Sequence, residues 1–313
     1  MKKLLIVSTS LLSTAVMAAM PVNQPTGSSF TLSSAPNQRA LSTALGNPAA
    51  PFIMVNQQDD DNFRFGILGP LSVGVEMGDV SDLADQVEEI EGLIDNANAI
   101  NAVSNKNRAN DILDEIGNSA YVKTTLSMQV PFMPVIYKTK DNGAFMLDAS
   151  ISGVAKGNLL ADKVAVNGTN DGLASDTSFY AQTATDFQIG LGYSQAMWEN
   201  SHGMLVGGAK ANIHQISMGR ALVRLDDDSI DAGDAISDSI SDDAVSSTGV
   251  GIDLGAVWVS NYYQVGLTLA NINEPEFDGA PITTNAASDK YNISASDKYV
   301  MEMQSTVDAA VST

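Results

Sequence analysis

The stretch GVGIDLGAVWVSNYYQVGLTLA, residues 249–270, carries the clearest structural pattern in the chain. Apolar residues occupy every second position on both sides of Ser260 and Asn261, and mainly glycine or polar residues stand between them. Successive side chains of a β-strand point to opposite faces, so this period of two predicts an antiparallel hairpin with one apolar and one polar face. We expect Leu254 and Leu267 on the apolar face and Asp253 on the polar face.

The same alternation recurs along the chain and predicts about eight strands. The first strand should bend near Gly69 and Pro70, because proline cannot donate a hydrogen bond to a sheet ladder. The expected strands cover residues 63–77, 122–130, 145–152, 187–194, 204–225, 249–258, 263–270 and 299–311.

The connections between these strands alternate between tight and long. Antiparallel strands that cross an outer membrane have short periplasmic turns and long outer loops, with aromatic residues at the membrane interfaces. Here Tyr137, Trp198, Trp258, Tyr262 and Tyr263 all lie beside the tight turns. We therefore expect an all-β fold, an antiparallel transmembrane β-barrel over residues 63–313, rather than a soluble sandwich. Its tight turns should face the periplasm.

The connection after the first strand has a different period. Leu83, Val87, Ile90 and Ile94 recur at spacings of four, three and four, which places them on one face of a helix. We expect a helical insertion at about residues 79–118, broken near Asn105–Asn107. It should be a packed helical hairpin, and a dedicated partner-binding face is the alternative.

The N-terminus resembles an export signal. Lys2 and Lys3 precede a short apolar stretch from Leu4 to Val16, and small residues follow up to Ala18. This stretch is shorter than the ~20 residues that a membrane-spanning helix needs. We expect a signal peptide at residues 1–18, an irregular segment at 19–62, and localisation in a bacterial outer membrane.

Composition excludes several classes of protein. The chain has no cysteine, so it can form no disulfide, thiolate nucleophile or cysteine-ligated metal site. With 16 basic and 37 acidic residues its net charge is −21, which argues against binding nucleic acid. A hydrophobic fraction of 44% is too high for a disordered chain.

No pattern in the sequence predicts catalytic, cofactor-binding or metal-binding residues, and we expect no enzyme. The segment 192–196, around Ser194, is one residue short of a G-x-S-x-G elbow and lies in a predicted strand. His202 and His214 lack the spacing of metal ligands. The acidic run at 226–243 lacks the ordered ligand positions of a calcium loop.

Three segments resemble known outer-membrane families. The residues Asn47-Pro48-Ala49-Ala50 and the hairpin at 249–277 resemble FadL-like outer-membrane proteins. The segment FRFGILGPLSVGVEMGDVSDLADQVEEI, residues 63–90, resembles the TraF-like (conjugal transfer TraF) branch of that superfamily. The resemblance extends from about Ser28 to the end of the chain. It implies a barrel whose N-terminal segment, within residues 19–62, lies in or under the lumen, where it could act as a plug.

The resemblance also implies two functions. FadL moves hydrophobic molecules across the outer membrane, so we first expect a protein that passes hydrophobic or small solutes. The alternative is a structural component of a conjugative transfer or pilus assembly apparatus. The implied partners are outer-membrane lipid, the barrel assembly machinery, and hydrophobic small molecules or conjugation proteins.

The end of the chain departs from the FadL-like pattern. Such barrels usually end on a strand with a terminal aromatic residue, whereas this chain stops at Ala309-Ala310-Val311-Ser312-Thr313. Eight strands close only into a narrow barrel that its own side chains fill. We therefore expect a C-terminally truncated chain in which the first and last strands are unpaired or cover each other imperfectly.

Overall fold

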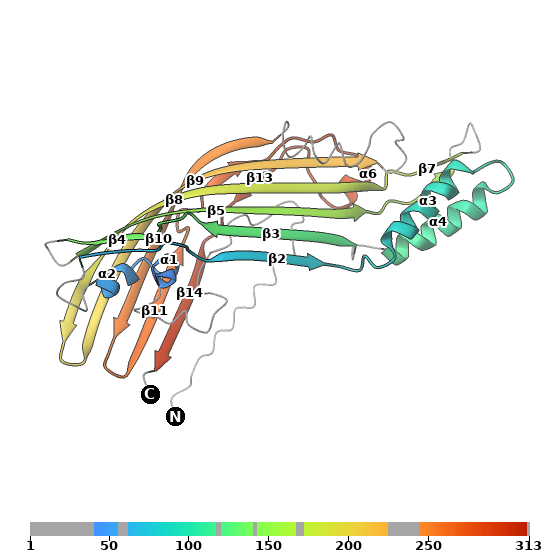
Figure 1. Cartoon of the computed structure of the whole chain (residues 1–313). Coiled ribbons are helices and arrows are strands. Elements are labelled where there is room, and N and C mark those ends of the chain that lie inside the picture. The colour runs from blue at the N-terminus through green and yellow to red at the C-terminus, as the bar shows by residue number, and fades with distance from the viewer. Residues whose placement is uncertain are drawn as a thin grey trace, which may run out of the picture.

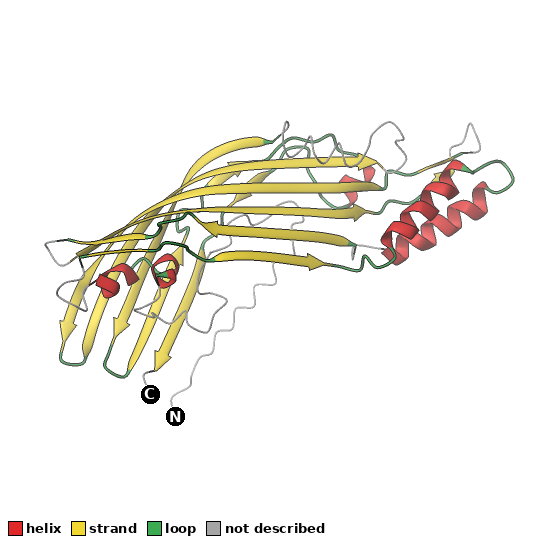
Figure 2. Cartoon of the chain, viewed as in Figure 1, coloured by secondary structure: helices red, strands yellow, loops and turns green. Residues whose placement is uncertain are grey.

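Long antiparallel strands form most of the structure (Figure 1, Figure 2). The computed structural model describes residues 41–55, 62–116, 120–139, 143–166, 172–224 and 244–311. One sheet has the order β2-β3-β5-β8-β9-β10-β11-β14, and β4 and β1 continue from the other end of β5. Its strands are β1 (Phe63–Phe65), β2 (Leu71–Met77), β3 (Tyr121–Gln129), β4 (Val135–Lys138), β5 (Gly143–Leu160), β8 (Ser178–Asn200), β9 (Gly203–Arg224), β10 (Val245–Val259), β11 (Tyr263–Ala270) and β14 (Gln304–Val311).

The sheet is open within the described ranges. β14 pairs only with β11, and β2 pairs only with β3. The prediction of antiparallel β structure is confirmed, since the described residues are mostly β with one large antiparallel sheet, whereas the predicted closed barrel is absent from the part of the chain that the structure describes. The predicted signal peptide and most of the segment 19–62 lie outside the described residues.

The predicted bend at Gly69 and Pro70 is present, and the neighbouring strand bends beside it. β1 and β2 pair with different strands, β4 and β3, because the chain breaks between Phe65 and Leu71. The backbone N–H of Gly66 donates to the carbonyl of Pro134 across this break. Each bend contains proline, which has no N–H for the ladder.

One prediction at the end of the chain is wrong. The segment 299–311 is not a single strand: β13 (Lys298–Val300) pairs with β12 (Glu276–Asp278), and only β14 joins the large sheet. The connection between the strands expected at 263–270 and 299–311 contains these two strands and α6 (Ala286–Lys290). Its side chains Phe277, Tyr299 and Met301 are buried. Their burial stabilises the arrangement in which this otherwise polar segment folds back onto the sheet.

The helical insertion is present as α3 (Leu83–Asp95) and α4 (Ala102–Ile116), at the opposite end of the molecule from the tight turns (Figure 1). The predicted break at Asn105–Asn107 is wrong, and the chain turns at residues 96–101. There the side-chain oxygens of Asn98 and Asn101 accept bonds from the backbone N–H groups of Ile100 and Asn98, which lie within the turn. α4 also contacts the small sheet of β6 (Ala165–Val166) and β7 (Leu173–Ala174).

A two-pronged ion pair joins the helices on their exposed side. The Arg108 guanidinium donates to both carboxylate oxygens of Glu89, at 2.7 and 3.1 Å. These hydrogen bonds hold the pKa of the Glu89 carboxyl below its ordinary value.

No helix among the described residues is both long enough and apolar enough to span a membrane.

The core of the helical hairpin gives the first testable prediction. Ile112 is 2% exposed and Ile100, at the tip, is 97% exposed. We expect Ile112→Ala to destabilise the hairpin by about 2–5 kcal/mol, because it removes buried methylenes and leaves a cavity. Hydrogen exchange of the amides in α3 and α4 measures this loss. Ile100→Ala is the control and should change protection by less than about 0.5 kcal/mol; equal effects would contradict the packing described.

Candidate functional site on the inner face of the sheet

The two faces of the large sheet carry different residues. We call the face that bears Asp148, Lys210, His214 and Asp253 the inner face, and the opposite face the outer face. Two segments remote in sequence cover the inner face: the N-terminal segment (residues 41–55) and a strap (residues 271–303). A row of buried polar side chains lies between them.

The N-terminal segment packs against the turn-side half of the inner face through α2 (Ala50–Val55), which follows α1 (Ser42–Gly46). Every residue of α2 is buried. Phe52, Ile53, Met54 and Val55 share a core cluster with residues of β4, β5, β9 and β10, among them Val206 of β9. Burial of these side chains gives the segment a fixed position on the sheet. The other wall residues of this cluster are Ile136, Ala144, Met146 and Val257.

Polar bonds orient the chain between the two helices. Asn47 accepts a bond from the Ala49 N–H at 2.9 Å and donates to the Leu267 carbonyl at 3.3 Å. The Thr268 hydroxyl donates to the Gly46 carbonyl at 3.1 Å, and the Ser194 hydroxyl accepts from the Phe52 N–H at 2.9 Å. The Asn-Pro-Ala-Ala motif is thus the point of attachment to the sheet.

Glycines in the sheet allow this close approach. A Cβ atom on Gly208 of β9 would collide with the carbonyl oxygen of Pro48, and one on Gly255 of β10 would collide with the side-chain oxygen of Asn47. Gly208 and Gly255 are directly paired in the sheet. The two glycines therefore leave the space in which the N-terminal segment lies, and a larger residue at either position would occupy that space. We call this pair of glycines the seat.

The strap begins where β11 ends and turns inward at two residues with positive φ, Asn271 (54°) and Glu274 (45°). The Asp253 carboxylate accepts the Asn271 N–H at 2.8 Å. Where β10 extends past the end of β11, its backbone edge would lack hydrogen-bond partners. The side chain of Asn273 supplies them. Its amide accepts from the Ile252 N–H at 2.8 Å and donates to the Val250 carbonyl at 2.7 Å.

The middle of the strap lies over the loop-side half of the inner face. Phe277, Tyr299 and Met301 pack on Ile216 and Met218 of β9. Further along β9 the buried guanidinium of Arg220 donates to strap carbonyls at both ends of a loop, Ala280 at 3.2 Å and Ser294 at 2.8 Å. It also donates to the Tyr180 hydroxyl at 2.9 Å. A buried cation needs such hydrogen-bond partners. Through these bonds Arg220 holds the strap against the inner face of the sheet.

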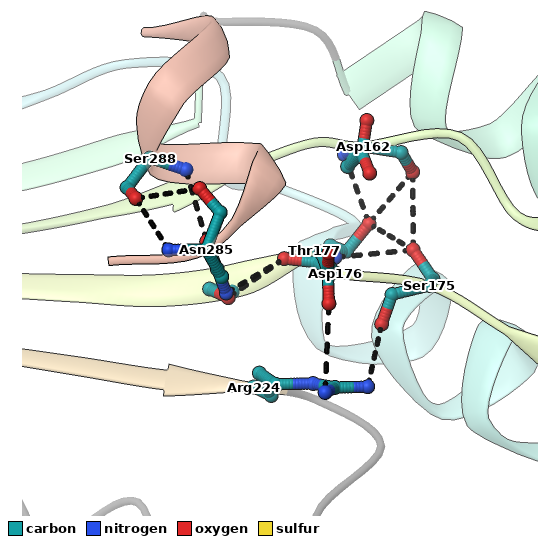
Figure 3. Close-up of polar contacts among 8 residues, drawn as sticks. Asp162, Ser175, Asp176, Thr177, Arg224, Asn285 and Ser288 are labelled. Atoms are coloured by element: carbon teal, nitrogen blue, oxygen red, sulfur yellow. Dashed lines mark hydrogen bonds and ion pairs between the residues drawn. The ribbon is translucent and has the colours of Figure 1, made fainter. Parts of the chain in front are cut away.

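The far end of the strap joins the loop ends of the long strands (Figure 3). Asn285 caps α6 in a reciprocal pair of bonds with Ser288. The same Asn285 amide donates to the Ser178 hydroxyl at 2.8 Å and to the Asp176 carbonyl at 3.3 Å. Figure 3 also shows the Arg224 side chain directed at Asp176, with 3.5 Å between the charged atoms.

A cavity of about 380 Å³ opens beside this junction, between α4, residues 161–163 and the end of α6. Lys290 and Tyr291 border it, and both donate hydrogen bonds to the carbonyl of Ala161. Burial raises the pKa of the Tyr291 phenol. Its remaining lining residues are Asn110, Leu113, Asp114, Asp162 and Lys163.

The row of buried polar side chains crosses β5, β8, β9 and β10. The Lys210 ammonium lies 3.0 Å from the Asp148 carboxylate, and both side chains are at most 5% exposed. Asn212 donates to Asp253 at 2.6 Å and accepts from Gln188 at 2.9 Å. Removal of one partner from such a buried pair leaves a charge uncompensated and destabilises the protein strongly. Nearer the loop ends of β8 and β9, the His214 ring lies 2.9 Å from the Asp186 carboxylate.

The residues singled out in the sequence occupy separate places. Ser194 is buried within a strand and accepts a bond from the N-terminal segment, so it is not on a nucleophile elbow. His202 is exposed in the turn between β8 and β9, whereas His214 is buried. The acidic run at 226–243 lies outside the described residues. Within the described ranges no three His, Asp or Glu side chains gather as metal ligands.

The outer face is apolar in a belt that crosses the strands obliquely. In one row of paired residues, Val73 and Leu126 are apolar, whereas Thr185 and Ser217 further along the row are polar. In a row of paired residues nearer the tight turns, the order of apolar and polar residues is the opposite. There Gln195 on β8 is polar, whereas the residues on β11 and β14 are apolar. Exposed apolar side chains of this belt include Leu71, Val73, Val75, Met77, Leu126, Met128, Phe145, Leu147, Ile151, Phe187, Ile189, Leu191, Ile213, Val250, Ile252, Leu254, Val265, Leu267 and Val307.

Comparison with known proteins identifies a family. A family model described as F plasmid transfer operon, TraF, protein matches residues 44–313. This range contains the seat of the N-terminal segment, the polar row and the strap. No curated protein and no solved structure matches the chain.

The glycine seat gives the second testable prediction. We expect Gly208→Ala to displace the N-terminal segment, because the new methyl group would overlap the Pro48 carbonyl. An Ile53→Cys substitution, at a position only 3% exposed, reports the displacement in this cysteine-free chain. Labelling of the thiol at position 53 should become at least tenfold faster in the Gly208→Ala background.

Gly192→Ala is the matched control. Gly192 also lies on the inner face, but a Cβ there would meet its neighbours at 3.5 Å or more, an ordinary van der Waals distance. This variant should leave the labelling rate of the Ile53→Cys thiol unchanged. Slow labelling in both variants would show that the seat does not hold the segment.

Proposed function

The chain belongs to the F plasmid transfer operon TraF family, and from this premise we propose that it is an outer-membrane β-barrel component of a conjugative transfer apparatus. The family match over residues 44–313 is the observation that carries the proposal. It favours the apparatus role over the solute transporter that the FadL-like resemblance placed first.

The apolar belt on the outer face supports the membrane location. Soluble proteins rarely expose apolar patches beyond a few hundred Å², and this belt extends over β2, β3, β5, β8, β9, β10, β11 and β14. Strands of membrane barrels tilt by 35–45°, and a flat lipid layer across tilted strands meets different registers on successive strands. The oblique path of the belt fits this geometry.

Strand length supports the same location. A tilted membrane strand needs about 9–11 residues, whereas β8 has 23 and β9 has 22. The surplus lies beyond the belt at the loop ends, where the outer face carries Thr185, Gln215 and Ser217. In this proposal the loop ends of β8 and β9 project from the membrane, and the helical hairpin between β2 and β3 lies on the same side.

Aromatic residues at the tight turns support the orientation. The rings of Trp198 and Trp258 lie 5.7 Å apart between centroids, and Tyr137, Tyr262 and Tyr263 are exposed near the same end. Such residues fit the interface between hydrocarbon and water. We place these turns on the periplasmic side, after export by the proposed signal peptide and insertion by the barrel assembly machinery.

The covered inner face supports a structural role rather than free diffusion through a pore. The N-terminal segment occupies one half of this face, the strap occupies the other half, and the polar row between them is buried. An open solute channel needs a hydrated lumen. We propose that the helical hairpin and the loop ends of the strands contact other proteins of the transfer apparatus.

The lipid-facing belt gives the third testable prediction. Leu254 lies in the belt, and Thr248 lies on the same face of β10 beyond it. We expect Leu254→Arg to lower the free energy of unfolding in lipid vesicles by about 2–4 kcal/mol and Thr248→Arg to lower it by about 0–1 kcal/mol. Denaturant titration in vesicles measures both. Equal losses would place the belt outside hydrocarbon. Asp253 is an unsuitable control because its carboxylate accepts two hydrogen bonds.

A mating assay tests the function itself. Donor cells that lack this gene should transfer the plasmid at least a hundredfold less often, and expression of the full chain should restore transfer. In parallel, Asn261→Cys should resist an impermeant thiol reagent on intact cells, whereas Ile100→Cys at the hairpin tip should react. Unchanged mating frequency together with impaired uptake of a labelled fatty acid would support the transporter instead.

A further inference from the structure

Two lysines lie directly opposite each other on the loop-side half of the inner face. Lys123 of β3 pairs with Lys156 of β5, and Glu76 of β2 pairs with Lys123, so the three side chains form one row across the strands β2, β3 and β5 of Figure 1. The row is on the inner face because an even number of residues separates Lys156 from Asp148 along β5. Like charges directly opposite each other in a sheet are destabilising, so this pair needs an explanation.

The two ammonium groups differ in their contacts. The Lys123 ammonium lies 3.6 Å from the Glu76 carboxylate. Among the described residues the Lys156 ammonium has neither a hydrogen-bond acceptor nor an ion-pair partner, and it contacts the ring of Tyr121 at 5.6 Å from the centroid. The Tyr121 hydroxyl donates to Glu76 at 2.8 Å. Glu76 therefore serves Lys123 and Tyr121, whereas the half-buried Lys156 has no anion of its own.

A buried amide next to Lys156 also lacks a partner. Asn158 follows Lys156 on the same face of β5 and pairs with Tyr121 of β3. Its side chain is 4% exposed, and its Nδ2 atom has no hydrogen-bond acceptor within the described ranges. A buried N–H group without an acceptor costs free energy. Lys156 and Asn158 thus bring N–H donors to one region of the inner face, and the donors of both lack acceptors.

This region lies beside the two coverings of the inner face. No residue of β3 belongs to the core cluster of the N-terminal segment or to that of the strap. β2, which carries Glu76, pairs only with β3 among the described strands, so the row ends at an open edge of the sheet. A ligand can therefore reach the row without displacing either covering.

We propose that Lys123, Lys156 and Asn158 bind the phosphate of a phosphate ester, either in a phospholipid headgroup or in a soluble molecule. Lysine binds phosphate as a point charge. Two ammonium groups and the Glu76 carboxylate leave one positive charge in the row, which matches the single negative charge of a phosphodiester. Phosphate also presents acceptor oxygens in several directions, as donors from two rows of the sheet require, whereas the oxygens of a carboxylate lie in one plane.

Ligands with short chains distinguish the two sources of phosphate. Purified full-length protein in a nonionic detergent is titrated by calorimetry with dihexanoylphosphatidylglycerol and, separately, with dimethyl phosphate. Binding of the lipid alone would assign the site to a headgroup, and binding of dimethyl phosphate would assign it to a soluble ester. Dihexanoylglycerol and hexanoate are the controls without phosphate. No binding of either ester, or equally tight binding of a control, would overturn the proposal.

Substitutions test whether the row itself binds the ester. Lys156→Met should weaken binding at least tenfold, because it removes the ammonium that lacks a partner, and Lys156→Arg should retain binding within about threefold. Lys163→Met, at an exposed lysine outside the row, is the matched control and should leave the affinity unchanged. If Lys156→Met does not fold, Lys123→Met replaces it, with the same loss expected. Parent-like affinity in the methionine variant of the row would overturn the proposal.

This binding site does not rest on the proposed conjugative role. The titration needs neither mating nor insertion into a bilayer, so its failure is distinct from failure of that role.

Discussion

The polar side chains on the inner face of the sheet impose the constraint on which the rest of this structure depends. Strands alternate strictly, so a continuous apolar outer face commits the intervening residues to the inside. Lys210 and Asp148 satisfy each other there, and Asp253 accepts bonds from Asn212 and from the root of the strap. A buried charge without such partners would destabilise the fold. The strands therefore supply most of these partners to one another when they pair in register, and the strap adds the Asn271 N–H to Asp253.

Two segments cover this inner face by different means. The N-terminal segment combines a cluster of apolar side chains with the close approach that Gly208 and Gly255 permit. The strap combines three large apolar side chains with carbonyl groups that receive the Arg220 guanidinium. It also covers the buried pair formed by His214 and Asp186. The proposed membrane component therefore has two inner coverings that differ in what holds them.

The amino-acid sequence by itself determined the parts of the structure that depend on local periodicity. The alternation in 249–270 predicted β10, β11 and their faces, and the spacing of Leu83, Val87 and Ile90 predicted a helix. Both patterns are visible locally because each follows from the repeat of one secondary structure. The break placed at Asn105 was wrong because asparagine side chains stabilise a turn at residues 96–101 instead.

Only the tertiary structure decided what covers the inner face. The segment that forms the strap was expected only as a connection between two strands, since Phe277 and Tyr299 are far apart in sequence and show no shared period. His214 and Asp186 were likewise unrelated until β8 and β9 paired in register and placed them side by side. The physical reason is that a strand pattern states which face a side chain occupies, whereas its partner depends on the register of another strand. Partners from distant segments therefore leave no signal in the sequence of either one.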